Sequence, residues 1–97
     1  MLTSKQRAYL KAMANSIDAI FQVGKGGVPD TLIKQVDDAL EVREIVKIRV
    51  LNNSPTDAKD AAQEIAHKTS SELVAVIGGR FVLYRKSVKE PKISLPI

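Results

Sequence analysis

Cysteine and tryptophan are absent from this chain, and only two Phe and two Tyr residues occur among its 97 residues. Without cysteine, disulfides and thiolate metal sites are excluded, and nothing indicates an oxidising compartment. Because aromatic residues are scarce, the core must be built from Leu, Ile, Val and Ala. A chain of this length, with 44% hydrophobic content, is enough for one small domain and leaves no room for a second.

Long apolar runs are also missing. No stretch approaches the roughly 18 residues of a membrane-spanning helix. The N-terminus carries Lys5 and Arg7 where a signal peptide would need an apolar segment. We therefore expect a soluble, cytoplasmic protein that has no membrane partner.

The side chains that usually perform catalysis are few. His67 is the only histidine, and it falls near the end of a predicted helix, where a cation interacts favourably with the helix dipole. Asp37 and Asp38 are adjacent, so on a helix they diverge by about 100° and cannot form a paired-carboxylate site by themselves. No nucleophile elbow, paired-histidine helix motif or P-loop is present. We therefore predict that the protein is not an enzyme and binds neither a cofactor nor a metal.

Charge is segregated along the chain, which carries a net charge of +4. Basic residues outnumber acidic ones in residues 1–28, 45–51 and 73–97, and the reverse holds in residues 29–44 and 52–72. A basic protein with its cations gathered in particular segments favours a polyanionic partner.

Hydrophobic spacing predicts three helices and four strands in the order α-β-α-β-α-β-β. The first helix covers residues 3–16, with Thr3 as its N-cap, and the second runs from Pro29 to about Glu41. In the third, Ser54 is expected to cap and Pro55 to open the helix, and the buried stripe is expected at Ala58, Ala61, Ala62, Ile65 and Ala66. The predicted strands are residues 19–23, 44–51, 72–77 and 80–85, the last two forming a hairpin across Gly78 and Gly79.

This order predicts an α/β domain in which helices pack on a mixed four-stranded sheet, with parallel strands joined by right-handed crossovers. We place the domain at residues 1–88. Residues 89–97 contain two prolines and little periodicity, so we expect a flexible or loosely docked C-terminal tail.

The strongest local motif is the loop of Gly24, Lys25, Gly26 and Gly27, between a predicted strand and the start of a helix. Glycines allow close approach of a backbone, and free N–H groups at a helix start attract phosphate oxygens. Taken alone, these four residues favour a tight turn that needs positive φ over a phosphate site. A GXXG loop beside basic segments, however, is the arrangement by which KH domains clamp a nucleic-acid backbone, so the context favours phosphate binding.

Several other cations and aromatics have two interpretations. Lys47 and Arg49 alternate with the core residues of a strand, and they could equally form a solvated face or a backbone-binding surface. Arg80, Arg85 and Lys86 lie in or beside the hairpin, and they could either contact a nucleic-acid backbone or serve only to keep the surface soluble. For Tyr9 and Tyr84 a place in the core is favoured over stacking on bases.

Three segments in order, LTSKQRAYLKAMA, IFQVGKGGVPDTLIKQVDDALEVREIVKIRVL and ELVAVIGGRFVLYR, resemble the CRM domain over nearly all of residues 2–86. The chain looks like the bacterial stand-alone, YhbY-like members, whose plant relatives act in chloroplast RNA splicing and ribosome maturation. The resemblance implies a fold similar to the C-terminal domain of translation initiation factor 3, association with precursors of the large ribosomal subunit, and RNA contact by the GXXG loop. Arg43 stands where the family often has a histidine, which puts a histidine-specific role in doubt.

We therefore predict an RNA-binding protein that acts on structured ribosomal RNA, in large-subunit assembly, and is monomeric. The predicted interface combines the first helix, the loop and the hairpin turn, through Lys5, Arg7, Lys11, Gly24, Lys25, Gly26, Gly27 and Arg80. The alternative is a protein-interaction adaptor that docks an assembly factor or ribosomal protein through its acidic helices.

Overall fold

The computed structural model describes residues 1–97 and contains the seven predicted elements in the predicted order. The helices are α1 (Ser4–Ala14), α2 (Asp30–Arg43) and α3 (Ala58–Thr69), and the strands are β1 (Phe21–Val23), β2 (Ile45–Val50), β3 (Glu72–Ile77) and β4 (Arg80–Tyr84). The α/β fold class inferred from hydrophobic spacing is thus confirmed.

The four strands form one mixed sheet in the order β1-β2-β4-β3. β1 pairs with β2 in parallel, while β4 runs antiparallel to both β2 and β3. The last hairpin therefore inserts β4 between β2 and β3, and these two remain parallel to each other without being neighbours.

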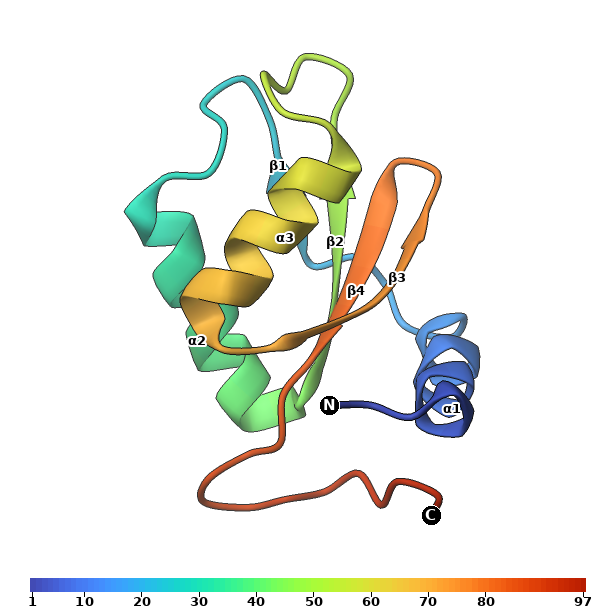
Figure 1. Ribbon diagram of the computed structural model, residues 1–97. Helices are drawn as coiled ribbons and strands as arrows, with labels where there is room; N and C mark the ends of the chain where they lie inside the picture. The colour runs from blue at the N-terminus through green and yellow to red at the C-terminus, as the bar shows by residue number, and fades with distance from the viewer.

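Helices cover both faces of the sheet, as Figure 1 shows. On one face, α2 and α3 pack through Leu32, Val36, Leu40 and the small residues of α3 against Val46, Ile48 and Phe81. On the other face, Leu10 and Ala14 of α1 pack against Ile45, Val82 and Tyr84. This division follows from the alternation of side chains along β2 and β4.

The helix starts are partly as predicted. The Thr3 hydroxyl caps α1 by accepting a hydrogen bond from the backbone N–H of Gln6 at 3.1 Å, and the Gln6 side-chain oxygen accepts one from the backbone N–H of Thr3, which completes a capping box. Pro29 is the residue before α2 rather than its first residue. The prediction for α3 was wrong: Ser54 bonds to Thr56 within a turn, and the helix begins after Asp57, whose carboxylate accepts from the N–H of Asp60 at 2.8 Å.

The C-terminal residues have a defined course under the sheet, although they form no helix or strand. Glu44, which ends α2 in a left-handed conformation and is fully buried, accepts hydrogen bonds from the backbone N–H groups of Ser87, Lys92 and Ile93. Ile93 and Leu95 pack against the α1 side of the core. The domain boundary at residue 88 stays a prediction, but these contacts attach residues 89–97 to both α2 and α1.

Candidate nucleic-acid interface

Three connections gather at one end of the sheet, the upper end in Figure 1. They are the loop of residues 24–27 after β1, residues 51–57 after β2, and the Gly78–Gly79 turn between β3 and β4. Backbone hydrogen bonds join them: Leu51 N–H donates to Val23 O at 2.9 Å, and Val50 N–H donates to Gly79 O at 2.7 Å. The glycine loop and the hairpin turn, which lie about half the chain apart in sequence, thus belong to one end of the domain.

The glycine loop is a tight turn that still leaves donors free. Gly27 has φ +70° and donates its N–H to Gly24 O at 3.0 Å, which closes the turn. The N–H groups of Lys25, Gly26 and Val28 have no hydrogen-bond partner, and the side chain of Lys25 is exposed. The start of α2 has no side-chain cap, so its first N–H groups also remain available, although Asp30 places a carboxylate beside them. The turn and phosphate-binding interpretations of this motif are therefore compatible.

A row of side chains crosses the sheet next to this end. Gln22, Arg49, Arg80 and Ile77 occupy paired positions on β1, β2, β4 and β3 in that order. Their row lies on the α1 face, because Val82, two residues from Arg80, packs against α1. Arg49 and Arg80 are directly opposite each other, both are exposed, and neither forms an ion pair. Like charges at directly opposed positions destabilise a sheet. This pair therefore lowers the stability of the domain, and the needs of folding alone do not explain why both residues are arginine.

Lys47 and Arg49, which sequence could not separate, have different roles. The ammonium of Lys47 donates to the carbonyl oxygens of Ala14 at 3.2 Å and Ile17 at 3.3 Å, and so fixes the end of α1 to the sheet. Arg49, two residues further along, has no such partner. The alternation of side chains along the strand places both cations on one face of the sheet, but it does not show which of them α1 covers. Arg49 was therefore missing from the predicted interface.

The first helix does not join the predicted surface as a whole. Its N-terminal half lies at the other end of the sheet, since Leu2 N–H donates to Glu72 at the start of β3. Arg7 belongs to the predicted interface, but its guanidinium turns toward the sheet and donates to the carbonyls of Leu73 and Val74. Those carbonyls are free because β3 is an edge strand with an irregularity at this point. Lys5 and Lys11 are exposed, and their contact with RNA stays a prediction.

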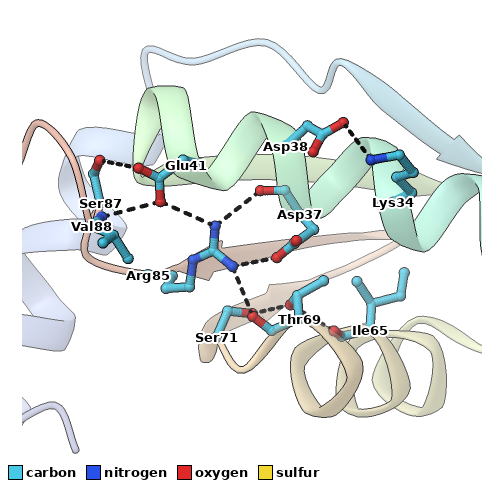
Figure 2. A network of polar contacts seen from close by, with 10 residues as sticks. All are labelled: Lys34, Asp37, Asp38, Glu41, Ile65, Thr69, Ser71, Arg85, Ser87 and Val88. Atoms are coloured by element: carbon cyan, nitrogen blue, oxygen red, sulfur yellow. Dashed lines mark hydrogen bonds and ion pairs between the residues drawn. The ribbon is translucent and has the colours of Figure 1, made fainter.

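Acidic side chains of α2 are largely occupied by the protein itself, as Figure 2 shows. Arg85, expected at the surface, is largely buried; it pairs with Asp37, donates to Thr69 O at 3.1 Å, and lies 3.7 Å from Glu41. Glu41 accepts from the N–H groups of Val88 and Lys89 and from the Ser87 hydroxyl. These hydrogen bonds, that from Val88 foremost, lower the pKa of Glu41 to about 2. Burial raises the pKa of Glu44, but the N–H groups of Ser87, Ile93 and Lys92 outweigh it, and the net shift is downward.

The structure also places the remaining candidate residues of the sequence. His67 is exposed in the last turn of α3, where the helix-end role was expected. No group of three His, Asp or Glu residues is placed to hold a metal ion. Tyr84 is buried, as predicted, whereas Tyr9 is 43% exposed on α1, so the core role predicted for it was wrong. None of the helices is long and apolar enough to cross a membrane.

The fold and this surface define a small α/β module with a glycine loop and free arginines at one end of its sheet. The model of the CRS1/YhbY (CRM) domain family matches residues 2–85, and the chain belongs to this family. The resemblance noted from sequence motifs is thereby confirmed.

Relatives of similar size are known. "Probable RNA-binding protein YqeI" of Bacillus subtilis is 46% identical over 96 residues, which cover 99% of this chain and 100% of the relative. An "RNA-binding protein" of Haemophilus influenzae is 30% identical over 95 residues, covering 98% and 95% of the two chains. The solution structure of the hypothetical protein SAV1595 from Staphylococcus aureus superposes with a TM-score of 0.82 at 50% identity, over 99% of this chain and 100% of that one.

Proposed function

We propose that this protein binds structured RNA through the end of the sheet that carries the glycine loop, and that it acts by binding rather than by catalysis. The observation that carries the proposal is that Arg49 and Arg80 face each other across two strands, form no ion pair, and lie beside a loop with free N–H groups. Two exposed arginines that face each other and form no ion pair are well placed to bind an external anion. Relatives covering the same length are described as RNA-binding proteins, which supports a nucleic-acid phosphate as that anion.

In this proposal each group has a definite task. The N–H groups of Lys25 and Gly26 donate to phosphate oxygens, and the Lys25 ammonium adds charge. Arg49 and Arg80 bind neighbouring phosphates, each guanidinium being able to donate to two oxygens. Such contacts fix the position of an RNA without reading its sequence, so selectivity comes mainly from the shape of the folded RNA.

The RNA we propose is that of the large ribosomal subunit or its precursor particle, with the protein acting during subunit assembly as a monomer in the cytoplasm. The support for this step is the resemblance to YhbY-like proteins. A protein-interaction adaptor is less well supported, because Asp37, Glu41 and Glu44 bind Arg85 and the C-terminal segment. Part of the acidic surface that such an adaptor would use is thus engaged within the domain.

The test uses Gly26→Asp with Gly26→Ala as its matched control. A Cβ added at Gly26 meets nothing within 4 Å, so both variants should unfold at the wild-type temperature. Gly27 is unsuitable, since its φ of +70° makes any side chain strained. We expect the aspartate to weaken binding to ribosomal RNA at least about tenfold by repelling phosphate, and the alanine to change it little.

Binding is measured with purified protein and ribosomal RNA, and in cell extracts by co-sedimentation with large-subunit particles. Equal binding by the aspartate and alanine variants would refute the role of the loop. Co-sedimentation that persists after complete removal of RNA would support the adaptor instead.

A further inference from the structure

A hollow of about 550 Å³ opens between the Gln22–Arg49–Arg80–Ile77 row and the segment that links α1 to β1. One wall is the linker, with Asn15, Ile17, Asp18 and Ala19, and the other is the sheet, with Gln22, Lys47, Arg49, Ile77, Arg80 and Val82. Its volume lies within the roughly 300–1,000 Å³ of small-molecule binding clefts.

The hollow exists because α1 stops short of the last row of the sheet. α1 ends at Ala14, and Lys47 holds the carbonyls of Ala14 and Ile17 against β2. Ile20 N–H then donates to Lys47 O at 3.2 Å, which brings the chain into β1. The linker is thus attached at both ends, and it forms a fixed wall beside the row rather than a cover over it.

The two walls carry opposite chemistry. The sheet wall presents Arg49 and Arg80, while the linker wall presents Asp18, an exposed carboxylate that forms no ion pair. The linker wall also carries Ile17, and the sheet wall ends at Ile77, which is 46% exposed. A phosphate alone would suit the arginines and be repelled by Asp18. A nucleotide suits both, because its phosphate is anionic and its base has an apolar face and hydrogen-bond donors on its edge.

We propose that this hollow holds one unpaired nucleotide of the bound RNA, with its two flanking phosphates at Arg49 and Arg80, its base against Ile17 and Ile77, and the edge of the base on Asp18. This inference rests on the proposed RNA binding and adds base selection to it. Guanine fits a carboxylate best, since its N1–H and N2–H donors are adjacent and match the two oxygens. Adenine and cytosine each place an acceptor nitrogen beside their amino group, and uracil flanks its single donor with two carbonyls. The hollow should therefore prefer guanine in a single-stranded loop, where bases are accessible.

The experiment compares RNA hairpins that share one stem and differ at one loop position, guanine against uracil, together with the blunt duplex of the same stem. Wild-type protein is tested beside Asp18→Asn, which keeps the side-chain shape, and Asp38→Asn, an exposed carboxylate on α2 at the opposite face. We expect the guanine loop to bind roughly five- to tenfold more tightly than the uracil loop. Asp18→Asn should abolish that preference, and Asp38→Asn should retain it.

Equal affinity for the guanine loop, the uracil loop and the duplex, unchanged in Asp18→Asn, would overturn the nucleotide site while leaving RNA binding intact. No binding of any of these RNAs by the wild-type protein at low salt would overturn the proposed function together with this inference. Thermal unfolding of each variant shows whether a loss of preference reflects the site or the fold.

Discussion

The dependence of RNA affinity on salt can be worked out from the cations at the loop end of the sheet. Lys25, Arg49 and Arg80 are exposed there, and none forms an ion pair. If each neutralises one phosphate, the logarithm of affinity should fall against the logarithm of salt concentration with a slope of about −2.1 to −2.7, since each phosphate contributes about −0.7 to −0.9. Raising monovalent salt from about 50 to 200 mM should then weaken binding about 20- to 40-fold.

The perturbation is the double variant Arg49→Gln/Arg80→Gln, which leaves only Lys25 of the three. Its slope should drop to about −0.7 to −0.9, so that the same change in salt weakens binding only about threefold. The matched control is Lys68→Gln/Lys89→Gln, which removes the same charge at the end of α3 and in the C-terminal segment, both away from the loop end.

The assay is fluorescence anisotropy of a labelled ribosomal RNA fragment, titrated with protein at several KCl concentrations. The control variant should keep the wild-type slope, because its lysines contact no phosphate. An identical loss of slope in both double variants would show that net charge, and not this surface, governs binding. A wild-type slope near zero would refute the electrostatic mechanism.

Three further predictions concern stability. Replacing Glu44 by Gln removes the buried charge that accepts hydrogen bonds from three backbone N–H groups. It should lower the free energy of unfolding by about 2–4 kcal/mol, seen as a lower urea midpoint, and an unchanged midpoint would contradict the role given to this carboxylate. The pKa of Glu41 is about 2 in the folded protein, against 4.5 for the free side chain. The ionised carboxylate therefore contributes fully to the free energy of unfolding above pH 4.5, and this contribution is lost as the pH falls toward 2. Thermal unfolding followed by circular dichroism should show this decline in stability between pH 4.5 and 2. The decline should be smaller in Glu41→Gln. A wild-type stability that is constant across this pH range would disprove the role given to Glu41. Arg49→Gln relieves repulsion by Arg80, so the same measurement should give stability equal to wild type or higher by a few tenths of a kcal/mol, whereas a clear loss would mean that Arg49 stabilises the fold.

Much of the fold follows from local sequence. The periodicity of α2, the capping residue Thr3 and the Gly78–Gly79 hairpin act over a few residues, so they could be located without a structure. The start of α3 could not, because Ser54 and Asp57 are both good capping residues and only the packed structure selects between them. The glycine loop was also found from sequence, since its residues are contiguous and its chemistry belongs to the backbone.

The cations show what tertiary structure alone decided. Sequence established that the chain has an excess of positive charge, that Lys47 and Arg49 share a face, and that Arg80 follows a turn. It could not establish that Lys47 fastens α1, that Arg7 and Arg85 are used inside the molecule, or that Arg49 faces Arg80 across a strand pair. Whether a charge is free depends on which distant backbone carbonyl or carboxylate lies within reach of it. That is set by how helices and strands pack, which no local pattern of residues records.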